Sequence, residues 1–173
     1  MITFESEYKN FNQRLFSLKN LLFLVNLIVI SSVIIIFNLS IFYIIIIELF
    51  LLTIFVFIII NRSKSNIDII SFKENNIILN GETFNTKWEK IINIKETQIE
   101  IQSIGSKQGL RGAIFYLILK NKKDNYIINS FETYSDEGIM QIFNEFKKFK
   151  DEKIIIDERL VLLRIQEKIE KCQ

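Results

Sequence analysis

The sequence predicts a membrane protein of mixed α and β structure, in which a helical hairpin precedes a small antiparallel sheet domain closed by a helix. Three observations predict this fold class. Between Lys19 and Arg62 the only charged residue is Glu48, and nearly all the others are apolar. After Arg62, short alternating apolar runs are separated by clusters of Gly, Asn and Lys, as in strands and turns. Towards the C-terminus the apolar spacing becomes helical.

Composition excludes several kinds of chemistry. The chain of 173 residues has no histidine and one cysteine, Cys172. These counts rule out histidine-dependent nucleophilic catalysis, histidine metal sites, an intramolecular disulfide and cysteine clusters for metals. The 22 basic and 20 acidic residues are nearly balanced, which argues against nucleic-acid binding. We therefore predict a protein that is not an enzyme and carries no cofactor or metal.

The apolar stretch is predicted to cross a membrane twice. A membrane-spanning helix needs about 20 apolar residues, and the stretch is about twice that long. We expect spans at residues 20–37 and 41–60, joined by a short turn at residues 38–40. The stretch has no cleavage site of a signal peptide, so it is expected to remain as an anchor.

Orientation follows from the basic residues that flank the spans. The turn carries no charge, whereas basic residues lie before and after the hairpin: Lys9, Arg14, Lys19, Arg62 and Lys64. By the positive-inside rule, both termini and the sheet domain are predicted to be cytoplasmic. Isoleucine and asparagine are frequent, as in proteins of AT-rich bacterial genomes, so the expected location is a bacterial inner (plasma) membrane.

Five polar residues within the spans are predicted to form a hydrogen-bonded seam. Residues equally far from the turn lie at the same depth, which places Asn26 beside Thr53 and Glu48 near Ser31 and Ser32. Glu48 has two interpretations: an intramembrane proton or ion site, or a carboxyl group bonded within the hairpin or to a second copy. We favour the second, because a transport path needs several ionisable groups.

Residues 61–150 are predicted to form the sheet domain. The expected strands are residues 67–72, 77–79, 83–85, 91–95, 98–104, 113–120 and 126–129. Asn80-Gly81 is predicted to form a tight turn, and residues 105–112 form the one long connection.

A helix is predicted after the last strand. Ser135 is a candidate N-cap, and Asp136 and Glu137 suit the first turn. Apolar residues then recur at helical spacing: Ile139, Ile142, Phe143, Phe146 and Phe149. This stripe is expected to cover the open end or face of the sheet.

Two features indicate a family resemblance: the order of these elements, and Trp88-Glu89-Lys90-Ile91 at the start of a central strand. The chain resembles bacterial proteins in which a pleckstrin-homology-like (PH-like) domain follows a two-helix transmembrane anchor. The resemblance covers about residues 66–150 and the hairpin. It implies a curved seven-stranded sheet or barrel capped by the C-terminal helix, with Trp88 and Ile91 in the core.

The resemblance also suggests where a ligand would bind. Eukaryotic domains of this fold bind phosphoinositides through basic residues in the first strand turn, where this chain has only Lys73 beside Glu74. The candidate contacts to lipid headgroups or a partner are Lys73, Lys107, Arg111, Lys122 and Lys123. Each such residue contributes about 1 kcal/mol near an anionic surface. The favoured alternative is that these side chains only solvate loops.

Both ends of the chain are predicted to be amphipathic helices. Residues 1–19 are expected to form a cytoplasmic helix that lies on the membrane or, slightly favoured, packs on the sheet domain. Residues 151–173 are expected to form a C-terminal helix whose apolar stripe docks on the N-terminal helix or on a second subunit.

Three kinds of function remain open. We favour a membrane-anchored binding or scaffold module that recruits a protein partner at the cytoplasmic face of the bilayer, or acts as a homo-oligomer through its spans or terminal helices. The alternative is a membrane immunity protein that protects the cell against a toxin. A subunit of a membrane transport complex is the weakest candidate, because Glu48 would be its only intramembrane ionisable group.

Overall fold

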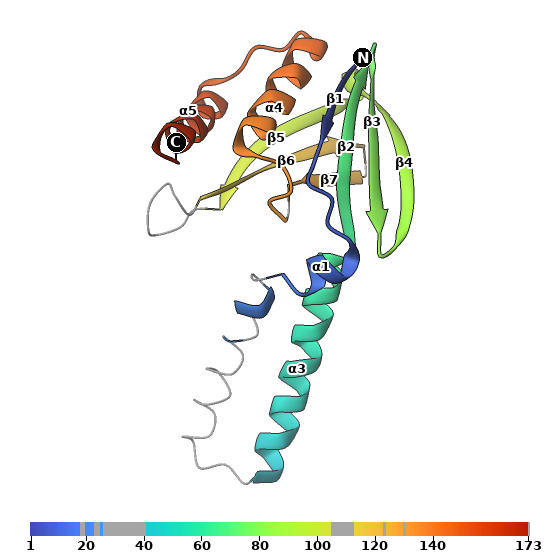
Figure 1. The fold of residues 1–173 in the computed structure, drawn as a ribbon, viewed down its shortest axis with the longest axis vertical. Coiled ribbons are helices and arrows are strands. Elements are labelled where there is room, and N and C mark those ends of the chain that lie inside the picture. Colours follow the sequence, from blue (N-terminus) through green and yellow to red (C-terminus); the bar gives the residue numbers. More distant parts are fainter. Residues whose placement is uncertain are drawn as a thin grey trace. The chain divides into compact units, whose positions relative to one another are not determined.

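The computed structural model describes residues 1–17, 20–22, 25, 41–104, 113–122, 124–129 and 131–172. The chain divides into two compact units (Figure 1). One, the sheet unit, contains Met1–Tyr8 and Asn66–Gln173; the other, the helical unit, contains Lys9–Ser65. Residues 66–150 and residues 151–173, which were predicted as separate segments, lie in the same unit together with residues 1–8.

The described strands form two antiparallel sheets that do not close a barrel. The first sheet has the order β1-β2-β3-β4 and the second has the order β5-β6-β7. Their bounds are β1 Ile2–Glu5, β2 Ser65–Lys73, β3 Asn76–Thr83, β4 Thr86–Asn93, β5 Thr97–Ile104, β6 Ile114–Asn121 and β7 Asp124–Ile128. A short 3-10 helix, η1 (Ile94–Glu96), connects the two sheets between β4 and β5.

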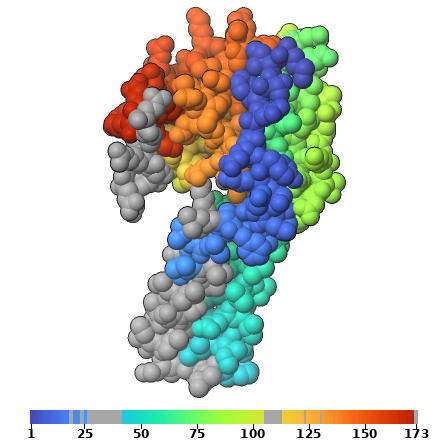
Figure 2. All heavy atoms as spheres, viewed as in Figure 1, coloured from blue at the N-terminus to red at the C-terminus, as the bar shows by residue number. Residues whose placement is uncertain are grey.

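The N-terminus is a strand, so the prediction of one helix over residues 1–19 was wrong. β1 pairs with β2 from Ile2↔Phe72 to Glu5↔Ile69, and the Phe4 ring packs edge-on against Phe72 at 6.1 Å. In Figure 2 the dark blue N-terminal residues lie beside the green of β2. The backbone hydrogen bonds of β1 are made with β2, a strand that is distant in the sequence. The spacing of apolar residues within the N-terminal segment cannot reveal this partner.

The β3–β4 hairpin corrects a second prediction. Asn80 and Gly81 do not form a turn but lie inside β3, opposite Glu89 and Trp88 of β4. The turn is at Phe84 and Asn85, where a strand was predicted, and Phe84 has a φ of 55° in the left-handed region. A Cβ atom on Gly81 would lie 2.3 Å from the Asn66 carbonyl oxygen and 2.5 Å from Trp88 Cζ2. Position 81 therefore requires glycine, because a side chain there would prevent the close approach of the Asn66 backbone and the Trp88 ring.

Helix α4 (Asp136–Lys150) confirms the predicted helix. The Ser135 side-chain oxygen accepts a hydrogen bond from the Gly138 backbone N–H at 3.0 Å, which caps the first turn. The predicted stripe faces the core, and Phe149 stacks on Phe72 at 5.5 Å. The core combines side chains of both sheets and of the C-terminal helices, among them Ile70, Phe72, Ile77, Leu79, Phe115, Leu117, Leu119, Ile139, Phe143, Phe146 and Ile165.

Helix α5 (Ile156–Cys172) confirms the second C-terminal helix but not its predicted docking place. It packs on α4 and β5 of its own unit, where Ile165 is fully buried, and residues 1–8, predicted as part of the N-terminal helix, contain strand β1 instead. Docking on a second subunit stays a prediction. Lys168 joins it to α4 and to the start of β6, because its Nζ lies 2.7 Å from Asp136 Oδ2 and donates to the Ala113 carbonyl oxygen at 2.8 Å.

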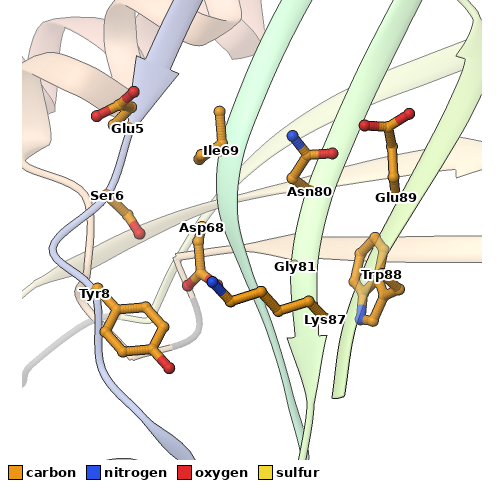
Figure 3. A pocket seen from close by; sticks show the side chains of 10 residues that line it. All are labelled: Glu5, Ser6, Tyr8, Asp68, Ile69, Asn80, Gly81, Lys87, Trp88 and Glu89. Atoms are coloured by element: carbon orange, nitrogen blue, oxygen red, sulfur yellow. The ribbon is translucent and has the colours of Figure 1, made fainter. Parts of the chain in front are cut away.

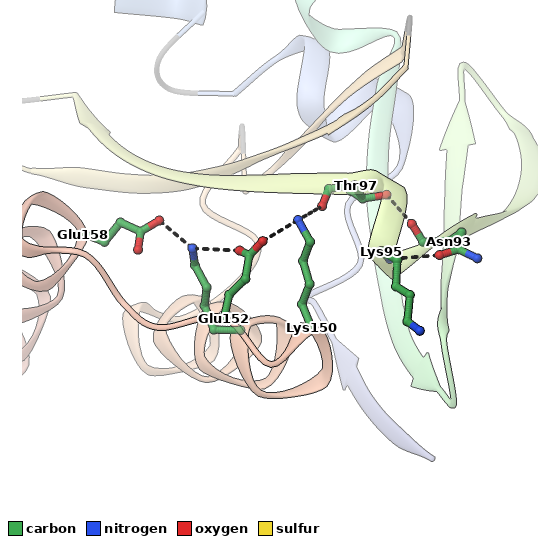
Figure 4. Close-up of polar contacts among 7 residues, drawn as sticks. Asn93, Lys95, Thr97, Lys150, Glu152 and Glu158 are labelled. Atoms are coloured by element: carbon green, nitrogen blue, oxygen red, sulfur yellow. Dashed lines mark hydrogen bonds and ion pairs between the residues drawn. The ribbon is translucent and has the colours of Figure 1, made fainter.

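A chain of ion pairs also fixes the two helices and β5 (Figure 4). Lys147 Nζ lies 2.8 Å from Glu158 Oε1 and 3.4 Å from Glu152 Oε2. Lys150 Nζ lies 2.7 Å from Glu152 Oε1 and donates to the Thr97 carbonyl oxygen at 2.7 Å. The hydrogen bond from Lys150 is the main reason why the pKa of Glu152 is lowered. Lys147 thus connects α4 to Glu158 of α5, and Lys150 connects α4 to β5.

The helical unit contains α1 (Phe11–Leu15) and α3 (Ile41–Ser63). Among the described helices, α3 is the one long and apolar enough to cross a membrane, and it matches the predicted span at residues 41–60. Its last carbonyl group is capped by Arg14, whose Nε donates to the Ser63 carbonyl oxygen at 3.0 Å. Most of the predicted span at residues 20–37 lies outside the described residues, and Asn20, Leu21, Leu22 and Val25 are helical.

Candidate functional site

A cleft of about 540 Å³ lies in the sheet unit (Figure 3), and we call it the β1–β4 cleft. It is lined by β1 and the loop after it and by β2, β3 and β4. The lining residues are Glu5, Ser6, Tyr8, Asp68, Ile69, Asn80, Gly81, Lys87, Trp88 and Glu89. Four neighbouring strands, together with one loop, therefore supply one binding surface.

Strand pairing brings these distant residues together. The strand register places Glu5 opposite Ile69, and Asn80 opposite Glu89. Gly81 lies opposite Trp88, and its missing side chain leaves the space that the indole ring occupies. Trp88 is half-buried and packs against the hydrophobic core, so the ring is held in place as a wall of the cleft.

The loop after β1 is fixed by polar contacts. The Tyr8 hydroxyl donates to Glu82 Oε2 on β3 at 2.7 Å, and the Glu7 backbone N–H donates to the Thr133 carbonyl oxygen at 2.8 Å. Because a charged acceptor makes a hydrogen bond stronger, the Tyr8 contact ties one rim of the cleft to the sheet.

The cleft is electronegative. Glu5, Asp68 and Glu89 contribute three carboxylates, and the lining contains one cationic side chain, Lys87. The neighbouring Tyr134 is sensitive to this charge: burial raises the pKa of its hydroxyl well above the usual range, and the Asp68 and Glu5 carboxylates raise it further. In Figure 3 the Lys87 side chain extends across the cleft in the direction of Asp68.

One polar atom of the lining lacks a partner. Asn80 Oδ1 is buried and, within the described part of the chain, accepts no hydrogen bond. A buried acceptor without a donor is unfavourable by about 1–3 kcal/mol. Because this oxygen has essentially no accessible surface, a group bound in the cleft would not contact it.

The predicted basic contacts are not part of this cleft. Lys73 ends β2 and is exposed, and Lys122 lies in the β6–β7 turn with its Nζ 2.9 Å from Glu96 Oε2. Lys122 lines a separate cleft of about 400 Å³ with Lys90, Asp124 and others. The remaining predicted contacts, Lys107, Arg111 and Lys123, lie outside the described residues.

The predicted seam is only partly within the described residues. Glu48 and Thr53 lie on α3, where Thr53 Oγ1 donates to the Leu49 carbonyl oxygen of its own helix at 2.8 Å. Asn26, Ser31 and Ser32 lie outside the described residues, so the seam itself stays a prediction.

Of the two residues of the Trp-Ile motif, only Trp88 packs against the core. Ile91 is 62% exposed, whereas its neighbour Ile92 is 8% exposed and belongs to the core, so the prediction for Ile91 was wrong. Side chains alternate between the two faces of a strand, and positions 88 and 91 differ by three, an odd number. One of the two therefore points away from the face on which the other lies.

Sequence reasoning had missed the acidic and polar residues of the β1–β4 cleft. Glu5 was predicted to lie in a helix and Gly81 in a turn. The sequence therefore did not predict that these residues line the same cleft as Asp68 and Glu89. The pairing of Trp88 with a glycine could have indicated the cleft, but this pair is recognised only with the correct register of the β3–β4 hairpin.

Neither metal-binding groups nor similar proteins identify the function of this cleft. Within the described ranges, no group of three or more acidic or cysteine side chains is arranged to hold a metal ion. No protein-family model matches the chain, and neither a curated protein nor a solved structure shows a significant match.

Proposed function

We propose that this protein is a non-enzymatic, membrane-anchored binding module that presents the β1–β4 cleft to a protein partner at the cytoplasmic face of a bacterial membrane. The observation that carries the proposal is the junction of α3 and β2. An apolar helix of membrane-spanning length ends at Ser63 and the sheet begins at Ser65, with only Lys64 between them. A domain with a formed cleft is thus attached to an anchor without a linker.

The pairing of β1 with β2 supports a two-span anchor. These strands are hydrogen-bonded neighbours, yet residues 6–64 lie between them in the chain. Both ends of this insertion must therefore lie on the same side of a membrane, which requires an even number of crossings. The apolar residues 21–37 supply the second crossing in addition to α3.

The arrangement of the sheet unit supports the PH-like interpretation. Four and three antiparallel strands followed by a terminal helix are the elements that the resemblance implies, with the difference that the first strand precedes the membrane segment. The cleft supplies aromatic surface and carboxylates, which are groups that recognise a ligand. We therefore assign binding to this cleft.

Cross-linking in native membranes tests the proposal. A photo-cross-linking amino acid at Lys87, which is exposed on β4 and lines the cleft, should give a specific protein adduct that mass spectrometry identifies. The matched control is the same amino acid at Leu163, which is exposed on α5. Absence of an adduct at Lys87, or the same adducts at both positions, would contradict a partner site at the cleft; lipid adducts alone would favour a membrane-binding surface.

The topology is tested separately by thiol labelling. Cys172 is the only native cysteine, so it reports the side of the C-terminus in the unmodified chain. In a Cys172→Ser background, Asn38→Cys reports the turn between the spans. We expect a membrane-impermeant reagent to label position 38 from outside and Cys172 only after the membrane is opened. Labelling of both positions from one side would rule out the hairpin.

A further inference from the structure

We propose that the turn of the β3–β4 hairpin is a second membrane contact, in which the Phe84 side chain enters the interfacial region of the bilayer that holds α3. This inference rests on the anchoring part of the proposed function and does not depend on a protein partner in the β1–β4 cleft. Three observations carry it: the exposure of Phe84, its backbone conformation, and the place of the turn at one end of the first sheet.

Phe84 presents a large apolar side chain at the surface of the chain. It is 45% exposed, and the two residues after it, Asn85 and Thr86, are polar and also exposed. Apolar surface that leaves water is stabilised, and aromatic side chains are frequent where a protein meets the headgroup region of a bilayer. Phe84 therefore has the chemistry of a residue that contacts lipid at this depth.

The turn itself does not account for phenylalanine at this position. Phe84 is the first of two residues between the paired Thr83 and Thr86, and its φ of 55° is in the left-handed region. A bulky side chain is unfavourable in this region, and glycine or asparagine is the usual residue at such a position of a two-residue hairpin turn. Strained residues of this kind are concentrated at functional positions. The side chain of Phe84, rather than its backbone, is thus the feature that a function explains.

The turn lies at the end of the sheet where β2 begins (Figure 1). β3 is the hydrogen-bonded neighbour of β2 and returns along it, and Gly81 closely approaches the backbone of Asn66 near the start of β2. Three further residues, about 10 Å along a strand, carry Phe84 to the level of the first residue of β2 or past it. Because neighbouring strands are only about 4.8 Å apart, Phe84 remains close to the start of β2.

The start of β2 identifies the lipid surface as that of the chain's own anchor. α3 is apolar as far as Ile60, and only residues 61–64, all polar, separate this apolar run from β2. A run that crosses the hydrocarbon core thus places the start of β2 at the headgroup region. Lys73, which was predicted to contact lipid, ends β2 and lies about 26 Å along the strand from this point. The lipid contact is therefore assigned to Phe84 and not to Lys73.

Spin labelling of the full chain in phosphatidylcholine vesicles tests the contact. In a Cys172→Ser background, one position at a time is changed to cysteine and labelled with a nitroxide. Relaxation by oxygen, which concentrates in the bilayer, is compared with relaxation by a water-soluble nickel chelate. We expect the oxygen-to-nickel ratio at Phe84→Cys to be several-fold higher than at Ile91→Cys. Ile91 is the matched control, because it is a 62% exposed apolar residue farther along the same hairpin.

A second measurement assigns the contact to the phenylalanine side chain. The label is placed at Asn85→Cys, so that Phe84 is retained. Phe84→Asn should then lower the oxygen-to-nickel ratio several-fold, because asparagine suits the turn but does not enter the bilayer. The matched substitution Ile91→Asn should leave the ratio at position 85 unchanged. Urea unfolding of each labelled variant verifies that the sheet unit is folded.

A label at Leu52→Cys on α3 separates this inference from the anchor. Equal ratios at positions 84 and 91, or no effect of Phe84→Asn on the label at position 85, would overturn the second contact. If the label at Leu52→Cys is nevertheless shielded from nickel, the anchor stands without that contact. A label at Leu52→Cys that is accessible to nickel would refute the anchor, and the contact of Phe84 with it.

Discussion

Replacement of Gly81 by alanine should destabilise the sheet unit and displace Trp88. The added Cβ atom would lie 2.3 Å from the Asn66 carbonyl oxygen and 2.5 and 2.9 Å from two atoms of the Trp88 ring. The first of these contacts is with backbone, so relief requires β2 and β3 to move apart. Overpacking of this kind costs about 1–3 kcal/mol, and each strained hydrogen bond between the strands adds about 1 kcal/mol. We expect a loss of about 3 kcal/mol in the free energy of unfolding.

The assay is urea unfolding of the full chain in detergent, followed by Trp88 emission. Because this is the only tryptophan and lies in the sheet unit, the signal reports that unit and not α3. The emission of folded Gly81→Ala should also shift to the red, since the indole loses its packing position. The matched control is Gly138→Ala on α4, where a Cβ atom would meet only side-chain atoms, at 3.2 and 3.9 Å.

The two substitutions should differ in size. Alanine is favoured over glycine in a helix by about 1 kcal/mol, and the contact of the new Cβ atom with the N-cap oxygen of Ser135 offsets part of that gain, so Gly138→Ala should change stability by less than about 1 kcal/mol. If Gly81→Ala unfolds at the same urea concentration as the unmodified chain, with unchanged emission, then the close approach of β3 to Asn66 and Trp88 is not real. The description of the cleft wall would then be wrong.

Three further predictions concern α4 and the two residues that precede it. Lys147→Met should lower the free energy of unfolding by about 2–3 kcal/mol, because Glu158, whose side chain is only 13% exposed, loses its nearest cation; adding Glu158→Gln should recover much of the loss in the same urea assay. Ser135→Ala should cost about 1 kcal/mol through loss of the N-cap, and an unchanged midpoint would contradict the capping role. Burial keeps Tyr134 neutral in the folded chain above pH 10, where the unfolded chain ionises, so stability should fall as pH rises above 10. Tyr134→Phe should reduce that slope, and identical pH profiles would refute it.

Features with local signals could be predicted from the sequence. The start of α4 was predicted correctly because Ser135, the acidic first turn and the apolar stripe all lie within one short segment. Strand β1 could not be predicted in this way, since its hydrogen bonds go to β2, far along the chain. Residues 3–18 also satisfy helical spacing, and only the distant partner decides between the two structures.

The cleft was hidden for a related reason. A glycine after an asparagine favours a turn when only neighbours are considered, whereas Gly81 is required by the carbonyl group of Asn66 and by the Trp88 ring. Once Gly81 is placed in the strand, the register of the hairpin fixes which side chains share a face. The exposure of Ile91 and the position of Trp88 then follow from alternation alone.

The insertion of residues 6–64 between paired strands links the cleft to membrane topology. β1 is synthesised before the apolar segment, and its partner β2 follows that segment. If the chain crossed the membrane an odd number of times, β1 would lie on the opposite side from β2. The cleft would then lack Glu5, Ser6 and Tyr8, and the edge of β2 would be left unpaired. Under the proposed function, formation of a complete cleft requires an even number of membrane crossings, and a chain with another topology would be unable to bind a partner at this site.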